Sequence, residues 1–594
     1  MTQILIQALC RRTALAQRPS ILILMVFVTG LSLTPSSCAS AQSSQELAPN
    51  VPTNGAIAFA ATPSPNPSTA PATTGQVQVQ QLKALVFVAT PKKIVKTGIS
   101  AQGIQIEGVT IPDEAAFRAL VSAFLGKRLT FVEIGRLKAA IVAFFRAHDR
   151  PAVNVLVPSQ DATNGVVQVV LLEARVGTIK VTGNKWFSTE SYRDALTLKP
   201  GDPISGSQVQ ADIDWINQNP FREAEIVYSP GATTDLTDVT IQAKDRFPLR
   251  VYAGYNDSGT AITGFQRYLA GAEYGNLFGL GHQLAYQFTT SSDGSSLRAH
   301  SVTYTAPLPW RDTLTLSGDY DSTQATIPPL TTETGEYWDL TARYAHPLPA
   351  FAHLTQKITM GFDFKHNRNS LIFGGLPVSN TPADIDQFVL GYNGMEKDRL
   401  GQTTVVPQIF ASPGGMMGDN TDGAFQAVRL YSKSQYAYGN LAVRRETRLP
   451  GNLSWVERGT FQIATANLQP SEELGFGGAD SVRGYDEREV NADNGYIINT
   501  EIYAPPVTLG ALLHRPELGD QLSFLVFWDY SGAYDERVVP GDPNARHLSS
   551  VGPGLRYVIG THFSMSFDYG FQFHQTGLDD EHGSRGEVSI VASY

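Results

Sequence analysis

The sequence predicts an all-β transmembrane barrel of about sixteen antiparallel strands, preceded by two small α/β modules. Two patterns in the 594 residues lead to this prediction. From about residue 247 to residue 594, apolar and polar side chains alternate with a period of two, as they do in strands with one apolar face. Between residues 101 and 246, apolar residues recur at helical spacing between short strand-like runs, and this arrangement occurs twice.

The alternation is clearest in FSMSFDYGFQF, residues 563–573. Aromatic and other apolar residues such as Phe563, Phe567 and Phe571 fall on one face of this segment, and polar residues such as Asp568 fall on the other. Residues 522–530 repeat the pattern. Their apolar face consists of Leu522, Phe524, Val526, Trp528 and Tyr530, and the opposite face carries Ser523, Leu525, Phe527 and Asp529.

The strands of a soluble β-sandwich would also show alternating apolar and polar residues, so the prediction of a barrel rests on two further features. The apolar faces are aromatic and uninterrupted, and several segments reach about ten residues, the length of a tilted transmembrane strand. Beyond the N-terminal region, no apolar stretch is long enough to span a bilayer as a helix, so a membrane protein with this sequence has to be a closed barrel. Residues 247–594 suffice for about sixteen such strands.

The last strand-like run, EVSIVASY, places Val588, Ile590, Ala592 and Tyr594 on one face. A final strand with an aromatic residue at its end resembles the assembly signal of bacterial outer-membrane barrels. We therefore expect Tyr594 to serve as that signal.

The two modules are expected at residues 101–175 and 176–246. In the first, the strand-like IQIEGVTI precedes a helix that Asp113 can cap, then a second helix and two strands, which gives the order β-α-α-β-β. The second repeats this order from GTIKVTG to DVTIQAK. A tandem repeat favours a modular binding arm; one irregular α/β domain is the alternative.

The N-terminal region is expected to be a signal peptide (1–41) followed by a Pro-rich periplasmic linker (42–100). Arg11, Arg12 and Arg18 precede a short apolar run, and Ala39-Ser40-Ala41 provides small residues for cleavage. A membrane anchor or a lipoprotein is the alternative. Both cysteines, Cys10 and Cys38, fall in the leader, so the mature chain is expected to lack disulfides, thiolate metal sites and a cysteine nucleophile.

Composition excludes several functional classes. The 55 acidic residues exceed the 45 basic ones, so no surface for nucleic acid is expected. Four late histidines lack the spacing of metal ligands, namely His547, His562, His574 and His582. We expect no enzyme, no metal and no cofactor.

A cluster of charge, GGADSVRGYDERE, occupies residues 477–489 around Arg483. By the parity of the following strands, Glu501 and Asp529 point into the lumen. A buried guanidinium needs a carboxylate with bidentate geometry, so a loop that folds back into the barrel would bring Arg483 to Asp529 and Glu501. Gly477, Gly478 and Gly484 would let such a loop bend and approach the wall closely.

The segment LGFGGADSVRGYDERE resembles the VRGY loop of two-partner secretion transporters, the ShlB/FhaC/HecB type, within the larger superfamily that includes BamA. FWDYSG (Phe527–Gly532) resembles the strand motif that carries the Asp partner of this loop. INQNPFREAEIVYSPG, residues 216–231, resembles the end of the second POTRA module of the same transporters. The resemblance extends over essentially the whole chain.

This resemblance implies an outer-membrane transporter that captures an unfolded exoprotein of haemolysin or adhesin type through its POTRA modules and conducts it through its barrel. It implies a transport loop of Val482, Arg483, Gly484 and Tyr485, with Asp529, Glu501, Phe527 and Gly532 as barrel-wall partners. The implied partners are the exoprotein, outer-membrane lipids and lipopolysaccharide, and the barrel assembly machinery during biogenesis. Family members often carry an N-terminal plug helix, but residues 42–76 are too rich in Pro for a good one.

Two other functions stay open at this point. A BamA-type assembly factor usually has more POTRA modules than two, and a passive porin needs none. The Arg483–Asp529 pair could gate the pore or hold the shape of the barrel.

Overall fold

The computed structural model describes residues 77–233, 236–327, 331–351, 353–373, 376–540, 546–574, 576 and 583–594. The expected signal peptide, the Pro-rich stretch 42–76 and His582 lie outside these residues. The chain forms two compact units. Of the described residues, 77–249 and 275–282 form one unit, and those of 250–274 and 283–594 form the other.

The first module is a four-stranded sheet with two helices. The sheet runs in the order β3 (Gly103–Glu107), β2 (Ala84–Val88), β6 (Val166–Glu173) and β5 (Val153–Leu156). Helices α2 (Glu114–Ser122) and α3 (Phe131–Ala147) contribute Phe117, Leu137 and Phe145 to one buried core with the sheet. As expected, Asp113 caps α2, since its side chain accepts a hydrogen bond from the Ala116 N–H.

The expected linker limit at residue 100 is wrong. β2 pairs in parallel with both β3 and β6 and all five of its residues are buried, so this strand is the centre of the first sheet. The run ALVFV is short and uniformly apolar, as a strand covered on both faces must be. β1 (Val77–Val79) also pairs, with β4 (Leu129–Thr130).

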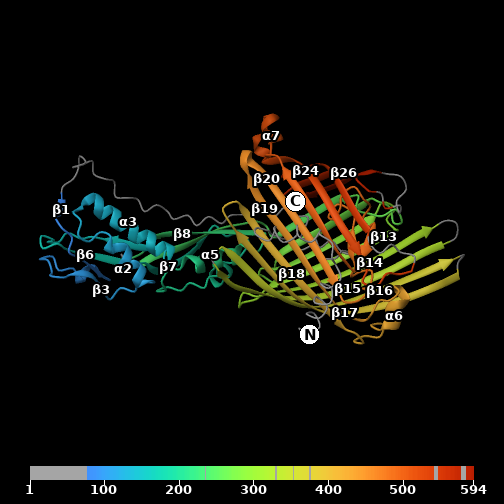
Figure 1. Ribbon diagram of the computed structural model, residues 1–594, viewed down its shortest axis with the longest axis horizontal. Coiled ribbons are helices and arrows are strands. Elements are labelled where there is room, and N and C mark those ends of the chain that lie inside the picture. The colour runs from blue at the N-terminus through green and yellow to red at the C-terminus, as the bar shows by residue number, and fades with distance from the viewer. Residues whose placement is uncertain are drawn as a thin grey trace, which may run out of the picture. The chain divides into compact units, whose positions relative to one another are not determined.

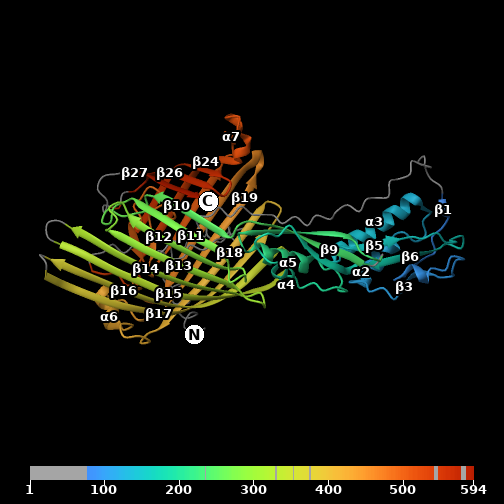
Figure 2. The ribbon, with the colours of Figure 1, turned by 180° about the vertical axis from the view of Figure 1, so that it is seen from behind.

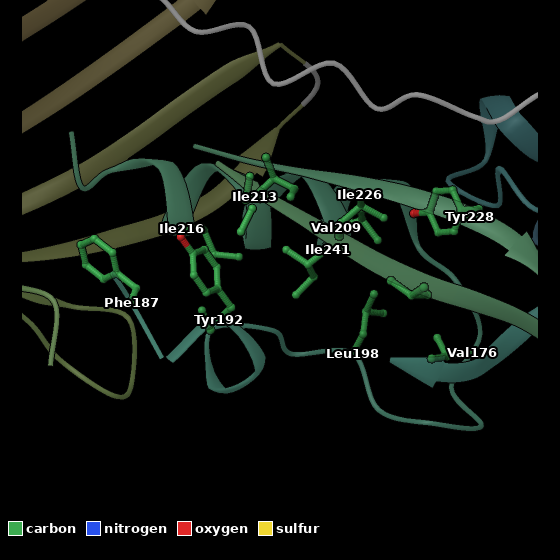
Figure 3. Close-up of a cluster of buried hydrophobic side chains, with 14 of the residues drawn as sticks. Val176, Phe187, Tyr192, Leu198, Val209, Ile213, Ile216, Ile226, Tyr228 and Ile241 are labelled. Carbon is green, nitrogen blue, oxygen red and sulfur yellow. The ribbon is translucent and has the colours of Figure 1, made fainter. Parts of the chain in front are cut away.

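The second module has the expected order β-α-α-β-β. Its elements are β7 (Arg175–Thr182), α4 (Thr189–Asp194), α5 (Gly206–Asn217), β8 (Arg222–Pro230) and β9 (Leu236–Asp245), and the sheet order is β7-β9-β8. Val209 and Ile213 of α5 face Ile226 and Ile241 of the sheet in a core of its own (Figure 3).

Asp149, in the turn after α3, joins the two modules. Its carboxylate accepts hydrogen bonds from the Ser207 N–H (2.6 Å) and from the Ser205 and Ser207 hydroxyls (2.5 and 2.8 Å) at the first turn of α5. Burial alone would raise the pKa of Asp149, but the hydrogen bonds from Ser205 and Ser207 outweigh it and lower the pKa below its ordinary value.

The described strands from residue 249 onward close into a sixteen-stranded antiparallel barrel, which confirms the predicted architecture (Figure 1). The first strand β10 pairs with the last strand β27, so the sheet has no open edge (Figure 2). The strands are β10 (Leu249–Asn256), β11 (Arg267–Leu277), β12 (His282–Ser291), β13 (Leu297–Pro307), β14 (Thr313–Ile327), β15 (Thr331–Phe351), β16 (Leu354–Phe373), β17 (Leu376–Lys397), β18 (Gly401–Pro413), β19 (Gln435–Leu449), β20 (Leu453–Ala464), β23 (Asn494–Tyr503), β24 (Asp520–Tyr534), β25 (Arg546–Ile559), β26 (Phe563–Gln572) and β27 (Ser584–Ser593).

The period-two faces lie as the sequence predicts. On β24, Phe524, Val526 and Trp528 are exposed on the outside, whereas Phe527 and Asp529 are buried inside. Connections between barrel strands carry α6 (Asp422–Val428), β21 (Leu474–Phe476), β22 (Val490–Ala492), α7 (Leu509–Leu512) and the short 3-10 helices η3 (Pro450–Asn452) and η4 (Pro516–Leu518), and the first module contains η2 (Pro91–Lys93). Among the described residues, no helix is long and apolar enough to cross a membrane.

Candidate functional site

Residues 465–493, between β20 and β23, form a loop that packs against the barrel wall; we call it the lumen loop. β21 pairs with β22 at its base. Further along, Val482 and Tyr485 are fully buried and share an apolar cluster with Ala533 of β24 and Leu548 of β25. The loop is therefore anchored by its own apolar side chains as well as by charge.

Three glycines bend the loop as the sequence predicts. Gly477, Gly478 and Gly484 have φ values of +103°, +97° and +91°, a backbone region that favours glycine. Gly484 also lies directly against β26, where an added Cβ would come within 2.8 Å of the Gly570 carbonyl oxygen. Only a residue without a side chain fits between the loop and this strand.

Arg483 is buried and bonded through its whole guanidinium. Nε and Nη2 donate to the two carboxylate oxygens of Asp529, each at 2.8 Å, and Nη1 donates to Glu501 Oε1 at 2.7 Å. The Arg483 backbone N–H also donates to Asp529, at 3.1 Å. This is the bidentate arrangement that a buried guanidinium needs.

The wall completes the site around Arg483. The Arg483 guanidinium carbon lies 3.7 Å from the centroid of the Phe527 ring, which places the guanidinium over the aromatic face in a cation–π contact. Asn499 donates to Asp529 at 2.8 Å and to the Ser481 carbonyl at 2.6 Å, so it holds both the partner and the loop.

The charges around this site nearly cancel. Asp568 on β26 lies 3.6 Å from the guanidinium, so three carboxylates surround Arg483. Two wall arginines offset them, Arg458 beside Glu501 at 3.3 Å and Arg556 beside Asp568 at 2.8 Å. The arrangement resembles a structural lock more than an ion-binding site, because each carboxylate already has a cationic partner.

The tip residues next to Arg483 bond to the wall through their backbone and hydroxyl groups. The Gly484 N–H donates to Glu587 at 3.2 Å, and its carbonyl accepts from the Gln572 amide at 2.7 Å. The Tyr485 hydroxyl donates to the His574 carbonyl at 2.6 Å.

Two of the residues singled out in the sequence lie apart from Arg483. Gly532 faces the Tyr496 ring, which an added Cβ would meet at 2.9 Å, so its place on β24 is a packing position. Tyr594 follows β27, is 89% exposed, and its N–H donates to the Val251 carbonyl at 2.9 Å. Its role as an assembly signal stays a prediction.

Sequence reasoning missed Gly570, Gln572 and Glu587 as partners of the loop tip. A signal for two of them was present, because Gly570 and Gln572 share the inward face of FSMSFDYGFQF with Asp568. The alternation of apolar and polar residues shows which residues of a strand face the lumen. The tight backbone contact between Gly484 and Gly570 depends on the position at which the loop meets the wall, and the alternation does not determine that position.

A second charged group lies at the base of the loop. Arg429, just after α6, pairs with Asp493 (2.5 Å), Asp535 (2.8 Å) and Glu473 (2.8 Å). In the described part of the chain these three carboxylates are the group whose oxygens lie close enough to hold a metal ion. The Arg429 guanidinium already occupies the space between them, so they are better explained as its partners.

Comparison with known proteins identifies the family. Residues 235–522 match the haemolysin secretion/activation protein family ShlB/FhaC/HecB, residues 99–174 match the ShlB-type POTRA domain, and residues 174–245 match the POTRA family of surface antigen variable number repeats. The chain belongs to the ShlB/FhaC/HecB family. It is therefore a two-partner secretion transporter of the outer membrane, with POTRA domains on the periplasmic side.

Relatives and solved structures agree with this assignment. The chain is 22% identical to the heme/hemopexin transporter protein HuxB of Haemophilus influenzae over 75% of its length and 78% of that protein. It is 21% identical to the outer membrane transporter CdiB of an Escherichia coli strain, over 67% of the chain and 68% of CdiB.

Two solved structures have the same fold. CdiB from Escherichia coli superposes with a TM-score of 0.70 at 18% identity, over 89% of this chain and 93% of CdiB. CdiB from Acinetobacter baumannii gives 0.58 at 15% identity, over 87% and 90%.

Proposed function

We propose that this transporter exports one large secreted protein in unfolded form, binding it in the periplasm through its two POTRA modules and conducting it through the barrel lumen. The lumen loop is the movable constriction of that path, and Arg483 holds it in its resting position. The observation that carries this proposal is the buried bidentate pair of Arg483 and Asp529 inside a closed barrel.

The small net free energy of a buried ion pair is compatible with a loop that moves between two positions. A buried ion pair contributes little net stability, because desolvation of both charges offsets their attraction, but it favours one geometry strongly. A loop held mainly by hydrophobic burial would be harder to release, since its apolar surface would have to enter water. The lumen loop combines a few buried apolar residues with many polar contacts.

The POTRA modules can bind the cargo without recognising a particular amino-acid sequence in it. The sheet of the second module ends in the edge strands β7 and β8, and an extended polypeptide can add to such an edge through main-chain hydrogen bonds. Folding of the cargo outside the cell prevents its return and so makes transport proceed outward. Export at the normal rate of a cargo mutant that cannot fold would contradict this part of the proposal.

The other partners of the barrel follow from its location in the outer membrane. Outer-membrane lipids and lipopolysaccharide contact the outward aromatic faces, and the barrel assembly machinery inserts the strands during biogenesis. The proposal contains no catalytic step and needs no cofactor or metal.

The test is export of a candidate large, β-rich exoprotein from cells that express the wild type or Arg483→Ala. Arg458→Ala is the matched control, because Arg458 also contacts Glu501 but belongs to the wall strand β20. We expect the wild type and Arg458→Ala to export the cargo, and Arg483→Ala to assemble a barrel that still gives a folded band at low temperature but exports little. A wild type that moves no cargo overturns the proposal.

A further inference from the structure

The lumen loop is tied to the barrel at a second place, eleven residues before Arg483 in the chain. Glu472 is fully buried, and its Oε1 lies 2.7 Å from the Lys365 ammonium. Its Oε2 accepts hydrogen bonds from the Gln387 amide at 2.9 Å and the Tyr438 hydroxyl at 2.8 Å. Both carboxylate oxygens are thus bonded to the wall.

These partners lie in a different sector of the barrel from those of Arg483. Lys365, Gln387 and Tyr438 belong to β16, β17 and β19, whereas Arg483 bonds to β23 and β24 and approaches β26. The strand order of the barrel separates the two groups. The loop is therefore held on two sides of the lumen.

The second anchor is itself supported by buried polar groups. Gln387 Nε2 also donates to Asp363 at 3.0 Å, and the Tyr436 hydroxyl donates to Gln387 Oε1 at 2.8 Å. The Gln462 amide donates to the Glu472 backbone carbonyl at 3.0 Å. A network with this many fixed partners holds the Glu472 carboxylate in one position.

We propose that Glu472 and Lys365 form a second lock of the lumen loop, which holds its base while Arg483 holds its tip. This inference rests on the proposed function of the loop as a movable constriction. Release of the Arg483 lock alone lets the tip move about a fixed base, and the full width of the lumen opens only when both locks are released. Glu472 and Lys365 are positioning residues, since they act through the loop.

The first test is the single-channel conductance of the purified full-length transporter in planar bilayers. Glu472→Gln keeps the size of the side chain but removes its charge, so we expect the fraction of time in wide openings to rise about tenfold, as for an equilibrium shifted by one modest buried pair. Arg483→Ala combined with Glu472→Gln should raise wide openings by about the product of the single effects, because wide opening requires the release of both locks. The charge exchange Lys365→Glu with Glu472→Lys should restore much of the wild-type behaviour.

The second test replaces the Lys365–Glu472 ion pair with a covalent link. The sequence contains cysteine at positions 10 and 38 alone. With both replaced by serine, Lys365→Cys and Glu472→Cys can be joined by a short bis-maleimide, which reaches these largely buried positions when the loop base transiently leaves the wall. Wide openings should disappear on cross-linking, and the two single-cysteine variants treated with the same reagent should keep them.

Two results would overturn the second lock. One is a cross-linked protein that still opens widely, and the other is Glu472→Gln with the wild-type distribution of openings. Neither readout uses cargo, so the second lock can fail while wild-type cells still export the exoprotein. A failure of export in wild-type cells would instead contradict the proposed function.

Discussion

At the scale of single residues, the site depends on groups for which no other residue type substitutes. The planar guanidinium of Arg483 forms two parallel hydrogen bonds with Asp529 and stacks on the Phe527 ring. A lysine ammonium can form neither the bidentate pair nor the stacking contact. The pairing of Arg483 with Asp529 and Glu501 could be predicted from strand parity, because parity determines which carboxylates face the lumen. The contribution of Asp568 and Asn499 could not, since it depends on the exact height at which the loop meets the wall.

We predict that Arg483→Ala lowers the stability of the barrel by about 3–5 kcal/mol, the usual consequence of leaving a buried carboxylate without its partner. Arg483→Lys should lower it less, since the charge remains. The measurement is the temperature at which the folded band disappears on semi-native gels. Equal melting temperatures for wild type and Arg483→Ala would show that the pair contributes nothing to the resting barrel.

A second prediction concerns Gly570. A Cβ at this position would lie 2.6 Å from the Gly484 Cα and the Arg483 carbonyl oxygen, so Gly570→Ala should push the loop tip off the wall and make it accessible to added protease. Gly586→Ala is the control, because its Cβ would meet Tyr569 at an ordinary 3.4 Å. Similar protease resistance of both variants would argue against the close contact.

At the scale of elements, the two POTRA modules are linked by hydrogen bonds between the Asp149 carboxylate and the start of α5. Asp149 follows α3 of the first module, and its partners Ser205 and Ser207 start α5 of the second. Helix caps within one module could be predicted from sequence, as Asp113 shows. The contact of Asp149 with α5 could not, because Asp149 precedes Ser205, the N-cap of α5, by more than fifty positions.

We predict a pH-dependent stability that originates from Asp149. Its pKa is lower in the folded than in the unfolded state, so the stability it contributes is present above the unfolded pKa of about 3.9 and is lost as the pH falls through the folded pKa. Urea unfolding of a fragment 77–249 should show this loss in the wild type and a smaller one in Asp149→Asn. Identical pH profiles for the two proteins would contradict it.

At the scale of the whole molecule, periodicity predicted the architecture. The period of two from about residue 247 to residue 594 predicted a barrel of about sixteen strands, and the described barrel has sixteen. The period arises because one face of each strand meets lipid and the other meets the polar interior. The start of the first module was predicted less well. A uniformly apolar strand such as β2 has no period, and a Pro-rich stretch before it makes it look like part of a linker.

Under the proposed function, the lumen loop leaves its site on the wall when cargo passes. Val482 is fully buried in the resting protein, whereas Met417, in the connection between β18 and β19, is 49% exposed. The most direct measurement is therefore labelling of Val482→Cys by a membrane-impermeant maleimide in intact cells, with and without the exoprotein, and with Met417→Cys as the control that labels in both states. We expect Val482→Cys to react only while cargo is exported. Normal export with Val482→Cys unlabelled would contradict it.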